Sequence, residues 1–103
     1  MKDIVDNVEQ WRARGERVAI ATVVATRKSA PRPVGSKLAI AESGAMCGSV
    51  SGGCVENDVY LHAREVFGGG EPQLLTYGIT DDEALGVGLP CGGEIDVFVE
   101  LLD

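Results

Sequence analysis

The segment from Val18 to Thr26, VAIATVVAT, is a nearly continuous run of β-branched and small apolar residues. Strands covered on both faces of a sheet have such uninterrupted runs, whereas a strand with one face in water alternates. The run therefore predicts a strand in the middle of a sheet, covered on both sides. A chain of 103 residues has room for one domain around that strand.

The flanking segments predict the rest of a small α/β domain. Two segments have apolar residues at helical spacing, residues 2–14 and about Cys54 to Phe67. In the first of them the apolar stripe consists of Ile4, Val5, Val8 and Trp11. Further strands are expected at Lys37–Glu42, Ala45–Val50, Gln73–Ile79 and Ile95–Leu101. We expect a single domain with about five strands in a mixed sheet and two helices.

The charges argue against a nucleic-acid partner. The chain has 9 basic and 16 acidic residues, a formal charge of −7, whereas binding to a phosphate backbone requires a dense basic surface. Eight of the nine basic residues lie within residues 1–37. This asymmetry has two interpretations: ordinary solvated faces, or a local anion site made by Arg27, Lys28 and Arg32.

The sequence predicts a cytoplasmic protein without a membrane span. No apolar run approaches the ~20 residues of a transmembrane helix, and the charged start lacks a signal-peptide core.

Three cysteines, an odd number, argue against a disulfide framework. Cys47 lies in an expected strand and is assigned to packing. No zinc site is expected from Cys47, Cys54, Cys91 and His62, because the close C-x₂₋₄-C pairs of structural zinc modules are absent.

The first candidate site is GSVSGGCVEND, residues 48–58. Ser51, Gly52 and Gly53 lead into a helix expected to begin near Cys54, and adjacent glycines let backbone N–H groups approach an anion. A helix N-terminus also favours the thiolate of Cys54, although two acidic residues of the first turn, Glu56 and Asp58, oppose both effects. The alternative is a glycine-rich turn in which Cys54 is a small buried residue.

Two further segments carry candidate residues. In GVGLPCGGEIDVFVE, residues 86–100, a loop delivers Cys91, Gly92 and Gly93 to the start of the last strand. Ligands tend to bind at strand ends, so we expect Cys54 and Cys91 to face one pocket; the alternative is two unrelated turns. The proline-stiffened loop after the central strand contains Arg32, whose guanidinium can bind an oxyanion bidentately. The alternative is that this loop is only solvated.

Three motifs together resemble one known family. They are Ser29-Ala30-Pro31-Arg32 followed by Gly35, Gly48-Ser49-Val50-Ser51-Gly52-Gly53-Cys54-Val55-Glu56, and Gly88-Leu89-Pro90-Cys91-Gly92-Gly93. In this order they resemble the XdhC/CoxI family, the maturation factors of molybdenum hydroxylases such as xanthine dehydrogenase and carbon monoxide dehydrogenase. The resemblance extends over most of the chain, from the first helix to the last strand.

The resemblance implies a protein that binds molybdenum cofactor. Such a protein holds the cofactor transiently while a cysteine desulfurase supplies the sulfido ligand, then inserts it into the apo-hydroxylase. By this resemblance Cys54 and Cys91 are molybdenum ligands or sulfur carriers, and Ser29 and Arg32 contact the phosphate. The backbone cradle consists of Ser51, Gly52, Gly53, Gly92 and Gly93.

The resemblance is incomplete at the C-terminal side. Many members of the family continue into a Rossmann-like domain, which is absent from residues 1–103. Three roles remain open: a non-enzymatic insertion chaperone, a thiol-dependent sulfurtransferase or oxidoreductase that uses Cys54 or Cys91, and a plain assembly module. The target enzyme and the formation of a homodimer also remain open.

Overall fold

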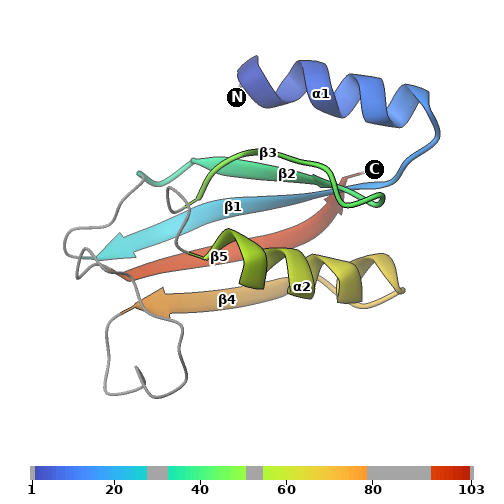
Figure 1. Ribbon diagram of the computed structural model, residues 1–103. Coiled ribbons are helices and arrows are strands. Elements are labelled where there is room, and N and C mark those ends of the chain that lie inside the picture. Colours follow the sequence, from blue (N-terminus) through green and yellow to red (C-terminus); the bar gives the residue numbers. More distant parts are fainter. Residues whose placement is uncertain (1, 28–32, 51–54, 79–93, 103) are drawn as a thin grey trace.

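The computed structural model describes residues 2–27, 33–50, 55–78 and 94–102 (Figure 1). The elements of these residues, in chain order, are α1 (Lys2–Ala13), β1 (Val18–Arg27), β2 (Lys37–Ala41), β3 (Met46–Gly48), α2 (Glu56–Phe67), β4 (Gln73–Gly78) and β5 (Glu94–Leu102). Each of them corresponds to an element predicted from the sequence, and no end differs from the prediction by more than two residues. The small α/β domain is thus confirmed.

The sheet is antiparallel throughout. Its strand order is β3-β2-β1-β5-β4, and every neighbouring pair in that order is antiparallel, so the expectation of a mixed sheet is wrong. The helical connection through α2 does make β3 and β4 run in the same direction. These two strands lie at opposite edges of the sheet, however, with three strands between them, and they cannot pair.

The main core lies between the sheet and α2. Alternate residues of the two central strands are fully buried there: Ala19, Ala21 and Val23 of β1, and Ile95, Val97 and Val99 of β5. From α2, Val59, Ala63 and Val66 pack against these strands at helical spacing. Burial of each large aliphatic side chain stabilises the fold by about 1.5–3 kcal/mol.

The opposite face of the sheet is covered by α1 over only part of its width. Ile4, Val8 and Trp11 are buried in a second cluster with Val18 and two alanines of β2, and α1 also contacts β3. Val5, expected on the same stripe, is 39% exposed. Figure 1 shows α1 beside β2 and β3, away from β4.

The central strand is covered on both faces only in its first half. Val18 is buried under α1, whereas Val24 is 47% exposed. The prediction of complete cover is therefore wrong for the second half of β1, because α1 extends over β2 instead. The pairing of β1 with β5 also shifts between Val23 and Ala25, which makes Val24 an extra residue in the strand.

Candidate functional site

Three adjacent strands begin or end side by side at one end of the sheet. Arg27, the last residue of β1, pairs with Glu94, the first residue of β5, and Glu94 pairs in turn with Gly78, the last residue of β4. Neighbouring strands lie about 4.8 Å apart, so these three positions span roughly 10 Å. The chain leaves β3 toward α2 at the same end (Figure 1). We call this the loop end of the sheet.

The predicted site residues belong to three segments, 28–32, 51–54 and 79–93, whose described neighbours lie at the loop end. These residues are Ser29, Arg32, Ser51, Gly52, Gly53, Cys54, Cys91, Gly92 and Gly93. All of them lie outside the described residues, so their roles and the pocket shared by Cys54 and Cys91 stay predictions. The structure does place the residues at which the three segments join the domain.

Strand β3 ends at a glycine that no other residue can replace without strain. Gly48 has a φ of +91°, in the left-handed region that favours glycine. A Cβ at this position would clash with the carbonyl oxygen of Lys37 and lie 2.9 Å from Cγ2 of Ile4. The next residue, Ser49, donates its backbone N–H to the same Lys37 oxygen at 3.0 Å. Gly48 therefore sets the direction in which the chain leaves β3.

A carboxylate connects the two sides of segment 51–54. Oε2 of Glu56 accepts a hydrogen bond from the hydroxyl of Ser49 at 2.7 Å and one from the backbone N–H of Val50 at 2.9 Å. The residues before and after the segment are thereby held together. The sequence identified Glu56 only as a charge that opposes anion binding; in the structure it joins the described residues on the two sides of segment 51–54.

A second hydrogen bond joins the edge strand to the same helix. Tyr77, at the end of β4, is 3% exposed, and its hydroxyl donates to Oδ2 of Asp58 at 2.7 Å. Burial, and next the bond to the Asp58 carboxylate, raise the pKa of Tyr77 far above its ordinary value. The phenol therefore remains a proton donor at physiological pH and holds the start of α2 against the end of β4.

The helix begins later than the sequence predicts. Its first residue is Glu56 and its N-cap residue is Val55, so Cys54 precedes the N-cap instead of opening the helix. The favourable interaction of a thiolate with a helix N-terminus falls off within one turn. The late start of α2 therefore gives less support to a helix-stabilised thiolate at Cys54 than the sequence predicts.

The described rim of the loop end is acidic. Glu56 and Asp58 of α2 and Glu94 and Asp96 of β5 lie at or near it. Asp96 accepts a 3.0 Å hydrogen bond from the hydroxyl of Thr76. An oxyanion bound at this end would therefore depend on backbone N–H groups and on the basic residues between 27 and 32.

The two potential zinc ligands that the structure describes lie on opposite faces of the sheet. Cys47 packs against the α1 cluster and accepts a 3.3 Å hydrogen bond from the amide of Asn7, in agreement with its predicted packing role. His62 lies on α2, where Nδ1 is 2.8 Å from Oε1 of Gln73 and Nε2 is 3.5 Å from Oδ2 of Asp58. Cys47 and His62 cannot share a metal ion.

Sequence reasoning missed the polar links of Glu56 and Tyr77. Tyr77 and Asp58 are 19 residues apart, and their contact depends on how α2 packs across β4. No local spacing signals it. The link from Glu56 back to Ser49 did have a weak signal, since a serine before a glycine turn and a glutamate after it can close the turn.

Neither helix of the described residues has the length and apolar character that a membrane crossing requires.

Comparisons with known proteins give a consistent set of relatives. The model of the XdhC and CoxI family matches residues 11–78. The molybdenum cofactor insertion chaperone PaoD of Escherichia coli (strain K12) is 36% identical over 88 residues, which cover 85% of this chain and 27% of that protein. A probable xanthine dehydrogenase subunit of Bacillus subtilis (strain 168) is 33% identical over 87 residues, covering 82% of this chain and 26% of that protein.

A solved structure has the same fold. The crystal structure of a xanthine dehydrogenase from Bacillus halodurans superposes with a TM-score of 0.79 at 28% sequence identity. The match covers 96% of this chain and 30% of that chain. The chain thus spans less than a third of the length of each of these relatives.

Proposed function

The chain belongs to the XdhC and CoxI family, and from this premise we propose that it binds molybdenum cofactor at the loop end of the sheet. In this proposal the domain is a carrier in the cytoplasm and not an enzyme. It holds the cofactor while a cysteine desulfurase provides sulfur and then passes it to a hydroxylase of the xanthine dehydrogenase type. The name of the Escherichia coli relative, a cofactor insertion chaperone, supports this role.

The observation that carries the proposal is the meeting of strand ends at one place. Arg27, Gly78 and Glu94 lie side by side in three adjacent strands. They are the residues next to the segments that hold Arg32 and Cys91. Glu56, held to Val50 at 2.9 Å, lies at the same end and follows the segment that holds Cys54. The points at which the three segments join the described domain therefore lie at one end of the sheet, which supports a single ligand bound by all three segments.

The chemistry of these residue types fits the cofactor, which is here the cargo. A thiolate is a soft ligand suited to a sulfur-rich metal centre, which supports Cys54 and Cys91 as the residues that contact molybdenum. Backbone N–H groups at Ser51, Gly52 and Gly53 suit a phosphate, as do those at Gly92 and Gly93. For the same phosphate, Arg32 supplies a guanidinium that can bind bidentately, and Ser29 supplies a hydroxyl.

The polar links of the described residues support a site with fixed geometry. The Glu56 carboxylate and the Tyr77 hydroxyl each hold the start of α2 to a neighbouring strand end. A binding site loses affinity when its residues must be ordered on binding, so such connections reduce the cost of binding. A binding site of fixed geometry would therefore explain why these two polar contacts are present, since the packing of the core does not require them.

Anaerobic titration of the purified chain with isolated molybdenum cofactor tests the proposal. We expect saturable binding that is weakened at least about tenfold, or 1.4 kcal/mol, by Cys54→Ala and by Cys91→Ala. Cys47→Ala is the matched control, because Cys47 packs under α1 and should leave affinity unchanged. Equal affinity of the native chain and all three variants would contradict the proposal, as would no binding at all. Persulfide on Cys54 or Cys91 without cofactor binding would instead indicate a sulfurtransferase.

A further inference from the structure

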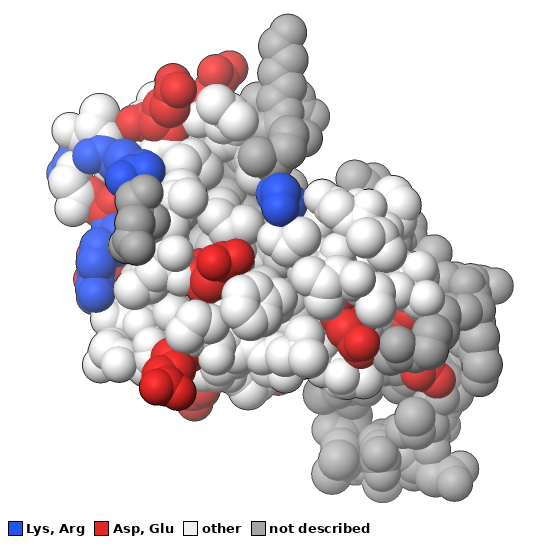
Figure 2. Space-filling model, turned by 180° about the vertical axis from the view of Figure 1, so that it is seen from behind, with Lys and Arg blue, Asp and Glu red and all other residues white. Residues whose placement is uncertain are grey.

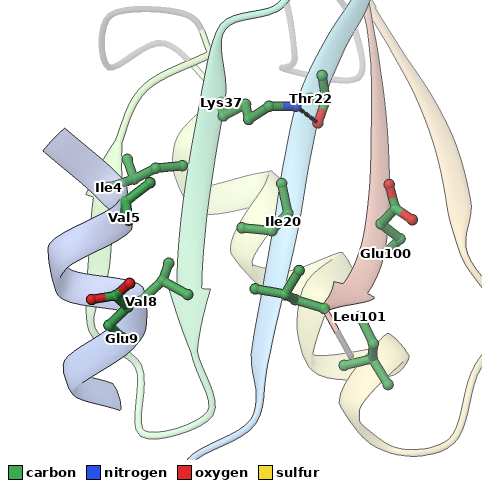
Figure 3. Close-up of a pocket in the computed structure, with 10 residues that line it drawn as sticks. Ile4, Val5, Val8, Glu9, Ile20, Thr22, Lys37, Glu100 and Leu101 are labelled. Atoms are coloured by element: carbon green, nitrogen blue, oxygen red, sulfur yellow. Dashed lines mark hydrogen bonds between the residues drawn. The ribbon is translucent and has the colours of Figure 1, made fainter. Parts of the chain in front are cut away.

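A groove of about 320 Å³ lies on the face of the sheet opposite α2 (Figure 3). One wall is α1, which contributes Ile4, Val5 and Val8, and the other side is formed by the end of β5, with Leu101 and Leu102. Ile20 of β1 lies between them on the floor. The groove is thus lined mainly by aliphatic side chains and lies away from the loop end.

The groove exists because α1 covers only one half of this face. Among the described residues, α1 is the helix on this side, and its buried stripe packs on β1 and β2. Val5 and Leu102, at the two sides of the groove, are 39% and 37% exposed. Leu74, which pairs with Phe98 on the same face, is 61% exposed. Apolar surface that extends across a sheet face in this way is typical of an interaction site.

Acidic groups outnumber basic groups in the described lining of the groove. Glu9 of α1 and Glu100 of β5 line it on opposite sides, and neither has an ion pair within the part of the chain that the structure describes. Among the described residues of the lining, Lys37 is the basic one, and it donates a 3.0 Å hydrogen bond to the hydroxyl of Thr22 at one end of the groove. Viewed from this side, the middle of the surface is largely uncharged, with separate acidic groups and a basic group in it (Figure 2).

The aliphatic and acidic side chains of the groove favour one kind of occupant over another. A second copy of the chain would bring its own Glu9 and Glu100 to the contact, where they would face carboxylates of the same charge, which is unfavourable. A segment with aliphatic side chains on one face and lysine or arginine beside them fits both features. Its aliphatic groups would cover the floor of the groove, and its cations would reach the two carboxylates.

We propose that the groove between α1 and the end of β5 binds a basic, amphipathic segment of another polypeptide. The site goes beyond the cofactor role and does not depend on it. Aliphatic contacts with Val5 and Leu102 supply most of the affinity. Glu9 and Glu100 supply the preference for a basic partner, since rim charges act mainly on specificity and rate.

Fluorescence anisotropy with a labelled synthetic peptide tests this proposal. The probe has leucines on one helical face and lysines on the other, and its partner probe has glutamate in place of each lysine. Near physiological ionic strength, charges more than about 8 Å apart are screened, so attraction by the overall charge is small. We expect the lysine peptide to bind the native chain at least about tenfold more tightly than the glutamate peptide.

Matched variants locate the binding. Val5→Gln and Leu102→Gln should each weaken binding of the lysine peptide about tenfold. Leu61→Gln, at a 58% exposed leucine on α2, should not change it. Glu100→Lys should weaken binding about three- to tenfold more than Glu71→Lys, which makes the same charge change at an exposed residue outside the groove lining.

Three results would overturn the proposal. One is no binding of the lysine peptide by the native chain. Another is an equal effect of the groove variants and their controls, which would assign binding to the overall charge. The third is a dimer in sedimentation equilibrium that Val5→Gln dissociates, because a second copy would then be the occupant.

Discussion

Tyr77 and Asp58 are joined by a 2.7 Å hydrogen bond that connects the end of β4 to the first turn of α2. Tyr77 immediately precedes the last residue of β4, after which segment 79–93 begins, and Asp58 follows segment 51–54 by a few residues. These two segments contain Cys91 and Cys54. One buried phenol thus fixes the spacing between the attachment points of the two cysteine segments.

Tyr77→Phe removes the hydroxyl and keeps the ring in the core. A hydrogen bond to a charged group contributes about 1.5–3 kcal/mol, and here somewhat less, because the Asp58 side chain is 34% exposed and water can replace the phenol. We expect the free energy of unfolding to fall by about 1–2 kcal/mol in urea denaturation at pH 7. Tyr60→Phe, at a half-buried tyrosine on the same core, is the control. Equal losses in both variants would mean that the bond to Asp58 contributes nothing.

The raised pKa of Tyr77 predicts a pH dependence of stability. An exposed phenol in the unfolded chain titrates near pH 10, whereas in the folded chain burial and Asp58 keep it protonated above that pH. The stabilising effect of Tyr77 is therefore complete below about pH 10 and is lost as the pH rises further. The difference in unfolding free energy between the native chain and Tyr77→Phe should be constant from about pH 7 to 9 and shrink above about pH 10. A difference that stays constant up to about pH 11 would contradict the assignment.

Glu56→Ala should destabilise the chain by about 1–3 kcal/mol, because the Val50 N–H and the Ser49 hydroxyl lose their acceptor. Glu56→Gln retains a carbonyl oxygen and should lose less. Glu65→Ala, on the same helix with a side chain 66% exposed, should change stability by less than about 0.5 kcal/mol. Thermal or urea unfolding of the three variants checks the order. If Glu56→Ala were no worse than Glu65→Ala, the hydrogen bonds from Ser49 and Val50 to the Glu56 carboxylate would contribute nothing to stability.

The elements of the fold were predictable because local patterns determine them. The β-branched run from Val18, and the spacing of Val59, Ala63 and Val66, each appear within one element. The pairing of strands was not predictable in the same way. That β5 inserts beside β1 and separates β3 from β4 depends on the packing of the whole chain. Local spacing contains no information on it.

The candidate site also has features that local sequence predicts and features that depend on the packing of the whole chain. The glycine- and cysteine-containing segments could be selected as candidates from the sequence because glycine allows backbone conformations that few residues adopt, and cysteine supplies a reactive thiol. The links from Glu56 to Ser49 and from Tyr77 to Asp58 depend on tertiary placement, and sequence reasoning assigned the two carboxylates a different role. The predicted Cys54 and Cys91 lie outside the described residues, so their meeting in one pocket stays a prediction.

Arg32→Ala should weaken cofactor binding more than Arg12→Ala, although both variants remove one positive charge. Arg12 is an exposed residue in the last turn of α1, and a distant surface charge is screened beyond about 10 Å at moderate salt. A direct charged hydrogen bond from Arg32 to an oxyanion corresponds to roughly ten- to a hundredfold in affinity. Isotherms at two salt concentrations separate the two effects. If both variants lost the same affinity and both losses vanished at high salt, Arg32 would act only through the overall charge of the protein and not through a direct contact.

The central claim is that Cys54 and Cys91 contact the same cofactor molecule, and a double-mutant cycle of cofactor affinity tests it most directly. The dissociation constant is measured for the native chain, Cys54→Ala, Cys91→Ala and the double variant, with Cys47→Ala as the control. If both sulfurs hold one molybdenum centre, either substitution removes the chelate, and the double variant should bind scarcely more weakly than each single variant. Two losses that simply add would show that the cysteines act independently and would contradict a shared site.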